Sequence, residues 1–449
     1  MATLHYAAYL LLLSLSLTVK PGKSQSFIGI NIGQVADNLP PPSATAKLLQ
    51  STTIQKVRLY GADPAVIKSL ANTGIGIVIG AANGDIPGLA SDPSAAASWI
   101  STNVAPFYPA SNIILITVGN EVMSSGDPNL VNNILPAMRN VQNALTAASF
   151  TKIRVSTVHS MAVLKQSEPP SAGAFDGDLM KGLLEFNKET GSPFAINPYP
   201  YFAYRDDTRP DTLAFCLFGP NPGRVDGNTK IKYMNMWDAQ VDAIYSALNA
   251  AGFKDVEIVV AETGWPYKGD ANEAGVNVES ARAYNGGLIS HLRSMAGTPL
   301  MPGKSVDTYL FALYDEDLKP GPGSERSFGL FNPDLTMTYD AGLMKSGNNT
   351  ASQGTDLGSA TAPAPTMTSP TTPTAPSSTN TSTTPSPVVP APFAARSASP
   401  PTSITGSDPR KSPQQLSTAK SSTSLGSLGH PYSCLSILLP LVLVGLLAR

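Results

Sequence analysis

Short apolar runs alternate along most of the chain with longer segments rich in alanine and leucine. The short runs are rich in β-branched residues, as strands are, and several of the longer segments follow Asp, Pro, Ser or Asn at a helix-capping position. The pattern predicts eight strands, at residues 27–32, 54–60, 75–80, 112–121, 152–158, 193–197, 256–262 and 306–313. It predicts helices between them, at residues 65–71, 94–104, 129–148, 237–251 and 278–295.

Strands that are apolar throughout, each followed by a crossover segment, are typical of a parallel sheet covered on both faces. Eight such units predict an α/β fold in which the sheet closes into a (β/α)8 TIM barrel over residues 26–345. The alternative is a doubly wound open sheet, which usually has fewer strands and a glycine-rich first turn. The glycines at 74–80 lie before and inside a strand, so they favour packing in the barrel.

The first 25 residues have the pattern of a secretory signal peptide. An apolar run covers residues 6–19 and is followed by small and polar residues. A transmembrane anchor is the alternative, but this run is too short to cross a bilayer.

The composition of residues 346–424 predicts a disordered stalk. They consist mostly of Ser, Thr, Pro and Ala, with Phe393 as the only aromatic residue, so they cannot bury enough apolar surface to offset the entropy of ordering. Asn348 and Asn380 each begin an N-glycosylation sequon, which becomes usable if the chain enters the secretory pathway.

Residues 425–449 resemble a lipid-attachment signal that is removed on maturation. The chain ends in an apolar tail, preceded by a polar spacer and by Ser421, Ser422 and Ser424, one of which we expect to carry a glycosylphosphatidylinositol (GPI) anchor. A membrane span is the alternative, but an apolar tail of about 15 residues, interrupted by Pro440, is short for a bilayer core.

Composition limits which partners the protein can bind and which side chains can carry out its reaction. Among 449 residues, 30 Lys and Arg against 32 Asp and Glu give a formal charge of −2, which offers no basic surface for nucleic acid. Two Cys and four scattered His exclude a disulfide scaffold and argue against a metal site, and we expect no cofactor. The reaction must therefore use carboxylates, hydroxyls or amides on a neutral partner.

In a barrel of this kind the active site lies at the carboxyl ends of the strands. This rule selects Arg58 and Tyr60 after strand two, Asn120 and Glu121 after strand four, Asn197, Tyr199 and Tyr201 after strand six, Glu262 and Trp265 after strand seven, and Tyr314, Asp315 and Glu316 after strand eight. Glu121 and Glu262 each end a long apolar strand.

A desolvated carboxylate is costly unless it is protonated, paired or hydrogen-bonded. One such glutamate alone could meet this condition in a purely structural role. Two on one rim match glycosidic-bond hydrolysis, in which one carboxyl group donates a proton and the other is ionised. Strands four and seven are expected to face each other, at the separation of roughly 5 to 5.5 Å used for retention. Glu262 is then the nucleophile, and Glu121 is the acid/base with a raised pKa.

Aromatic residues beside these carboxylates could bind sugar. Tyr199, Tyr201 and Trp265 offer flat apolar faces for pyranose rings, although each taken singly could equally be a core residue. Asn120, next to the expected acid, could hold the sugar 2-hydroxyl group.

Six segments are distinctive both in sequence and in their order along the chain: IGINIGQVADNLPPP, VRLYGADP, ITVGNEV, NPYPYFAY, IVVAETGWP and FALYDEDLKPGPGSERSFGLF. They resemble plant endo-1,3-β-glucanases of glycoside hydrolase family 17 over about residues 26–345. The resemblance implies a retaining (β/α)8 hydrolase that cuts β-1,3-glucan such as callose, with Glu121 as acid/base and Glu262 as nucleophile. It also implies a charged cluster of Glu316, Lys319 and Glu325 near the site, and a cleft lined by Tyr60, Asn120, Tyr199 and Phe331. Without the family, the loop at 315–326 would be a solvated segment with an ordinary salt bridge.

Two features depart from the family pattern. Ile32 replaces the aromatic residue of the common opening motif, between Asn31 and Gly33, and the stalk has no cysteine-rich carbohydrate-binding module. Without that module, binding of glucan must rest on the barrel groove.

Taken together, these features lead us to expect a monomeric enzyme that binds β-1,3-glucan in the barrel groove and is held by its lipid anchor on the outer leaflet of the plasma membrane. Mixed-linkage glucan is an alternative substrate. The sequence also leaves open a non-catalytic glucan-binding or wall-sensing protein and a structural surface glycoprotein.

Overall fold

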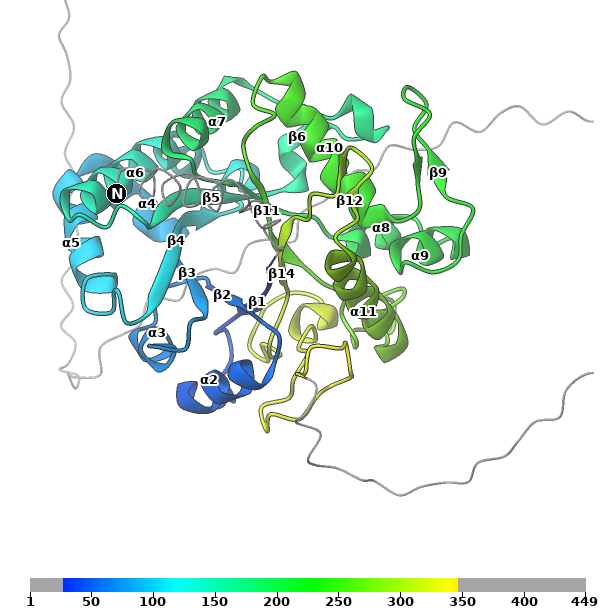
Figure 1. Ribbon diagram of the computed structural model, residues 1–449, viewed down its shortest axis with the longest axis horizontal. Coiled ribbons are helices and arrows are strands. Elements are labelled where there is room, and N and C mark those ends of the chain that lie inside the picture. Colours follow the sequence, from blue (N-terminus) through cyan, green and yellow to red (C-terminus); the bar gives the residue numbers. More distant parts are fainter. Residues whose placement is uncertain (1–26, 346–449) are drawn as a thin grey trace, which may run out of the picture. The chain divides into compact units, whose positions relative to one another are not determined.

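A computed structural model describes residues 27–345 of the chain. Eight parallel strands form a closed barrel in the order β1-β14-β11-β8-β5-β4-β3-β2, with helices around it (Figure 1). The predicted (β/α)8 barrel is confirmed. The predicted signal peptide, stalk and anchor signal lie outside the described residues, as do Asn348, Asn380, Ser421, Ser422 and Ser424.

All eight barrel strands occur where the apolar runs predict them, some of them shorter than the runs. They are β1 (Ile28–Ile32), β2 (Lys56–Leu59), β3 (Gly76–Ala81), β4 (Asn112–Asn120), β5 (Arg154–Ser160), β8 (Phe194–Asn197), β11 (Ile258–Thr263) and β14 (Asp307–Leu310). The remaining strands of the described chain form three two-stranded hairpins that the sequence did not predict: β6 (Leu164–Gln166) with β7 (Ala174–Phe175), β9 (Arg224–Val225) with β10 (Lys232–Tyr233), and β12 (Gly297–Thr298) with β13 (Met301–Pro302).

The five predicted helices are present as α3 (Pro64–Ser69), α5 (Pro93–Asn103), α6 (Pro128–Ala147), α10 (Met236–Ala250) and α11 (Val278–Ser294). Three of them start with an Asp-Pro pair, in which the aspartate caps the helix by accepting from its first amides: Asp63, Asp92 and Asp127. Helices that were not predicted are α2 (Pro42–Ser51), α4 (Ile86–Ser91), α7 (Asp178–Thr190), α8 (Pro200–Asp206) and α9 (Pro210–Cys216). Among the described residues, no helix is long and apolar enough to cross a membrane.

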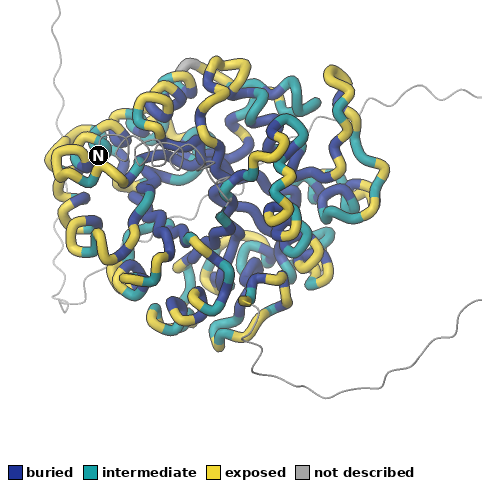
Figure 2. The backbone as a smooth tube through the Cα atoms, viewed as in Figure 1, coloured by how far each residue is buried: buried dark blue, intermediate teal, exposed yellow. Residues whose placement is uncertain are grey.

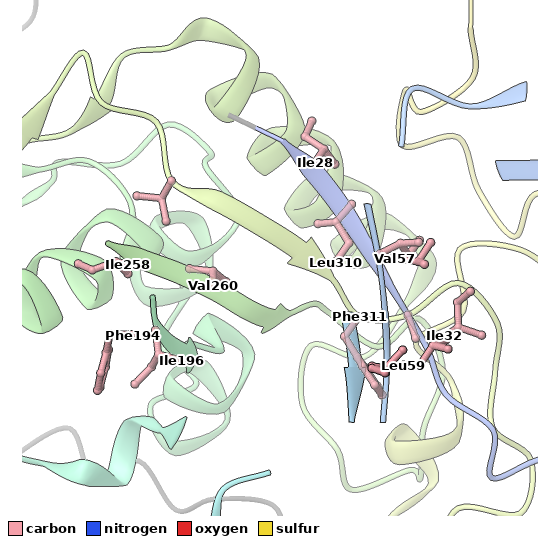
Figure 3. Packing of buried hydrophobic residues seen from close by; sticks show 14 of the residues in the cluster. Ile28, Ile32, Val57, Leu59, Phe194, Ile196, Ile258, Val260, Leu310 and Phe311 are labelled. Atoms are coloured by element: carbon pink, nitrogen blue, oxygen red, sulfur yellow. The ribbon is translucent and has the colours of Figure 1, made fainter. Parts of the chain in front are cut away.

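Alternate strand residues pack on opposite faces of the barrel wall. One set, which includes Val57, Ile196 and Leu310, belongs to the main hydrophobic core (Figure 3). Figure 2 shows the strands as the buried centre and the outer helices as partly exposed. The opposite face carries a small separate cluster inside the barrel, made of Val78, Leu115, Val259 and Tyr309. A strand face that packs against the helices and another that fills the barrel explain why the runs are apolar throughout.

The last described residues return to the amino ends of the strands. The amide of Thr53 donates to Leu343 O at 2.7 Å, and the amide of Lys345 donates to Ser51 O at 3.0 Å. Ser51 and Thr53 precede β2, so the chain leaves the barrel at the end opposite to the carboxyl ends of the strands.

Gly80 in β3 and Gly286 in α11 form a test pair for the packing. A Cβ atom on Gly80 would lie 2.4 Å from the carbonyl oxygen of Tyr60, whereas one on Gly286 would meet nothing within 4 Å. Gly80→Ala should destabilise the fold by about 1–3 kcal/mol or more, and Gly286→Ala should stabilise it by about 0.5–1 kcal/mol through helix propensity. Thermal unfolding midpoints check both changes, and equal midpoints for the two variants would contradict the packing described here.

Candidate active site

The carboxyl end of β4 has an unusual backbone that directs Glu121. Gly119 has φ +69° and Glu121 has φ +54°, and the register of β4 against β5 shifts between Thr117 and Asn120. A Cβ on Gly119 would lie 2.7 Å from a methyl group of Val122, so this position requires glycine for both conformation and space. The strained conformation of Glu121 is held by its amide, which donates to Val158 O at 2.8 Å.

The carboxyl end of β11 is also irregular. Its register against β14 shifts between Val260 and Thr263, and Glu262 lies within this stretch. Gly264 then lets the chain pass close to the neighbouring strand, because a Cβ there would lie 2.2 Å from Phe311 O.

Glu262 is buried and is held by two donors, one in β2 and the other at the residue before α8. Arg58 Nη1 donates to Glu262 Oε1 at 2.6 Å, and the Tyr199 hydroxyl donates to Glu262 Oε2 at 3.0 Å. The Arg58 side chain is itself buried, with the residue 1% exposed, and its Nη2 donates to Asn120 Oδ1 at 2.7 Å. The Arg58 guanidinium therefore fixes both the Glu262 carboxylate and the side-chain amide of Asn120, the residue before Glu121.

Glu121 has a different environment. Asn197 Nδ2 donates to Glu121 Oε1 at 2.8 Å. Burial, and then the negative charge of Glu262, raises the pKa of Glu121 to about 7, although Asn197, Arg58 and Lys319 act in the opposite direction. A carboxyl group with this pKa holds a proton near neutral pH, as general acid catalysis requires.

Glu316, Lys319 and Glu325 form a second charged group after β14. Lys319 Nζ lies 3.2 Å from Glu325 Oε2 and 3.9 Å from Glu316 Oε2, and Glu316 also accepts from the Val35 amide at 3.0 Å. A Cβ on Gly33 would lie 2.1 Å from the Glu316 carboxyl carbon, so the first loop can approach only as glycine. This cluster is largely buried, unlike the solvated loop that was the alternative.

Tyr60 lies between the two charged groups. Its ring packs edge-on against Phe311, and the Arg58 guanidinium lies 4.5 Å from its centroid. Burial and then Glu262 raise the pKa of the Tyr60 phenol well above its usual value, with a smaller effect from Glu316. Asn31 Nδ2 donates to the Tyr60 hydroxyl at 3.3 Å.

The structure thus gathers most of the predicted site residues at the barrel mouth: Tyr60, Asn120, Glu121, Tyr199, Glu262, Glu316, Lys319 and Glu325. In the closed barrel, β5 and β8 separate β4 from β11 on one side and β3, β2, β1 and β14 separate them on the other, so the two strands face each other obliquely across the mouth.

Three predicted contact residues are core residues instead. Trp265 is 0% exposed, stacks on Tyr204, and donates from Nε1 to Gly275 O at 2.9 Å. Tyr201 is 1% exposed and packs edge-on against Trp265, so neither ring has a face free for a pyranose. Phe331 also belongs to the hydrophobic core. The helix α8, which was not predicted, turns Tyr201 inward.

Arg58 and Asn197 hold the two glutamates, yet sequence reasoning gave them no role beyond their place at strand ends. The signal for Arg58 was available, because a charged residue within the apolar run 54–60 must find a partner when it is buried. Asn197 carried no comparable signal, since a neutral amide at a strand end suits many environments.

Two carboxyl groups with different donors can act as a proton donor and a charged partner in one reaction. Within residues 27–345, no three His, Cys, Asp or Glu side chains gather in a geometry that could hold a metal ion.

A family model described as glycosyl hydrolases family 17 matches residues 28–342. Glucan endo-1,3-beta-glucosidase 7 of Arabidopsis thaliana is 67% identical over 350 residues, which cover 77% of this chain and 69% of that protein. Glucan endo-1,3-beta-D-glucosidase of Olea europaea is 64% identical over 330 residues, which cover 73% of this chain and 72% of that one.

Solved structures give the same result. CJP38, a beta-1,3-glucanase and allergen of Cryptomeria japonica pollen, is 39% identical with a TM-score of 0.66, over 70% of this chain and 98% of that one. A structure from work on two plant beta-glucan endohydrolases with distinct substrate specificities is 35% identical with a TM-score of 0.64, over 70% and 99% of the two chains. The chain therefore belongs to glycosyl hydrolases family 17, the family that its six motifs indicated.

Proposed function

We propose that this protein hydrolyses internal β-1,3-glucosidic bonds of glucan chains such as callose, with retention of anomeric configuration. The observation that carries the proposal is the pairing of Glu121, whose pKa is about 7, with Glu262, whose carboxylate accepts from Arg58 and Tyr199. The names of the relatives support the 1,3 linkage and the internal cleavage.

In this mechanism Glu262 attacks the anomeric carbon while Glu121 donates its proton to the departing glycosidic oxygen. Arg58 and Tyr199 orient the attacking carboxylate. Formation of the glycosyl ester removes the negative charge of Glu262, so the pKa of Glu121 falls and Glu121 becomes a base. Glu121 then takes a proton from water, which attacks the ester and releases the sugar with its original configuration.

Incubation of the purified protein with linear β-1,3-glucan should cause a rapid fall in polymer length. NMR of the first products should show the β anomer, because two displacements restore the configuration. The α anomer would contradict retention, and release of glucose alone would contradict internal cleavage. Faster hydrolysis of mixed-linkage glucan would reassign the linkage.

Glu121→Gln should lower kcat by about 100- to 10,000-fold, because it removes the general acid. Glu262→Gln should abolish turnover, and Glu279→Gln, at an exposed position in α11, serves as the matched control. In the wild type, kcat/KM should fall above about pH 7, since Glu121 must be protonated. A wild type that binds glucan without cutting it would favour the wall-sensing alternative.

We further propose that the mature enzyme is held at the cell surface by a GPI anchor. The end of the chain supports this, since a polar spacer and an apolar tail follow Ser421, Ser422 and Ser424. The last described residue, Lys345, lies beside Ser51, at the end of the barrel opposite to the mouth. Phosphatidylinositol-specific phospholipase C should release the protein from expressing cells, and deletion of residues 425–449 should send it into the medium. Protein that stays in the membrane and keeps a tag at its carboxyl terminus would contradict the anchor.

A further inference from the structure

Two loops at the barrel mouth are joined by a pair of carboxylates. Glu273, in the loop after β11, accepts from the Ser324 amide at 2.9 Å through Oε2 and from the Ser324 hydroxyl through Oε1. Asp270, in the same loop, accepts from the Gly323 amide at 2.8 Å. Gly323 and Ser324 belong to the loop after β14. We call Asp270 and Glu273 the carboxylate clamp.

The clamp is a close-fitting contact. A Cβ on Gly323 would lie 2.6 Å from Asp270 Oδ1, and a Cβ on Gly269 would lie 2.6 Å from Glu273 Oε2. The Asp270 amide also donates to Glu273 Oε2 at 2.8 Å, which fixes the clamp itself. Ser324 is buried, so its amide and hydroxyl depend on Glu273 as their acceptor. Both loops have glycine where they touch, and the contact depends on it.

The clamp holds a segment that carries site residues. Ser324 lies in the short 3-10 helix η5 (Gly323–Arg326), and Glu325 is the next residue. Glu325 Oε2 lies 3.2 Å from Lys319 Nζ, and this ammonium lies 4.5 Å from the centroid of the Phe311 ring. A continuous set of contacts therefore runs from Glu273 through Ser324 and Glu325 to Lys319.

We propose that Glu273 is a positioning residue of the active site, which grips Ser324 and thereby keeps Glu325 and Lys319 beside the catalytic acid. The segment 320–323 reads Pro-Gly-Pro-Gly. Its two prolines fix φ at their positions and Arg326 Nη1 donates to Lys319 O and Gly321 O at 3.0 Å, so the freedom that outside contacts must remove lies at the two glycines. A charge-assisted acceptor that binds both polar hydrogens of one residue is suited to define that conformation. The kinetic consequence rests on the proposed function, whereas the positioning itself does not.

The sign of the effect follows from the charges around Glu121. Glu262 of β11 raises the pKa of Glu121, and Arg58 of β2 and Lys319 of the loop after β14 lower it. Of these three groups, Lys319 forms an ion pair with Glu325, the residue that follows the clamped Ser324. If the clamp loosens and Lys319 moves away, the pKa of Glu121 must rise.

The test uses Glu273→Gln, which keeps the shape of the side chain and removes its charge. Its alkaline limb of kcat/KM should move to higher pH by about 0.5–1 unit, the order expected when the positive charge of Lys319 withdraws from Glu121, whereas the direct loss of the negative charge of Glu273 would move the limb to lower pH. Lys319→Met should move the limb in the same direction, and the double variant should move it no further than Lys319→Met alone. Asp334→Asn is the control, because Asp334 also accepts from a loop amide and a hydroxyl, those of Thr336, in an exposed turn.

An unchanged limb in Glu273→Gln, or shifts that add in the double variant, would overturn the proposal. A purely structural role would lower the unfolding midpoint and leave the limb in place, so it also counts against positioning.

A readout without activity separates this inference from the proposed function. The carboxyl signal of Glu121 can be titrated by ¹³C NMR in glutamate-labelled protein and assigned by its loss in Glu121→Gln. Glu273→Gln should raise this pKa even if the wild type proves inactive on every β-glucan tested. An unaltered Glu121 titration would refute the positioning role whatever the activity.

Discussion

The chemistry of this site depends on an asymmetry between the carboxyl groups of two glutamates at one barrel mouth. Glu262 accepts from the buried guanidinium of Arg58 and from Tyr199, whereas the hydrogen-bond donor to Glu121 is the neutral amide of Asn197. Because both groups are desolvated, the one with the cationic donor is the better place for negative charge, and its charge then favours the proton on the other. The roles that we propose for Glu121 as acid and Glu262 as nucleophile follow from these donors.

The barrel and the location of its site could be predicted from the sequence because both follow from local patterns. Apolar runs defined the eight strands, and the rule that barrel sites lie at carboxyl strand ends selected Glu121 and Glu262. The same rule selected Tyr201 and Trp265 wrongly. Whether an aromatic ring after a strand faces the mouth or the core depends on the next turn of chain, and here α8 and the loop after β11 direct both rings inward.

The contacts between loops could not be predicted from the sequence. The approach of Gly33 to Glu316 and the clamp of Asp270 and Glu273 join segments that are far apart along the chain. A glycine in the sequence can indicate a close approach at its own position, but it does not indicate which other segment makes the approach. The resulting network links the first loop and the loop after β11 to the loop after β14, so the charge of Lys319 near Glu121 depends on residues outside the catalytic pair.

The most direct test of the central claim is the pKa of Glu121, measured by ¹³C NMR in the wild type and in Glu262→Gln. We predict a pKa of about 7 in the wild type and a clearly lower value in the variant, because the amide removes the negative charge that favours the proton. An identical pKa in both proteins would show that the two carboxyl groups are not electrostatically coupled, and the assignment of their roles would lose its physical basis.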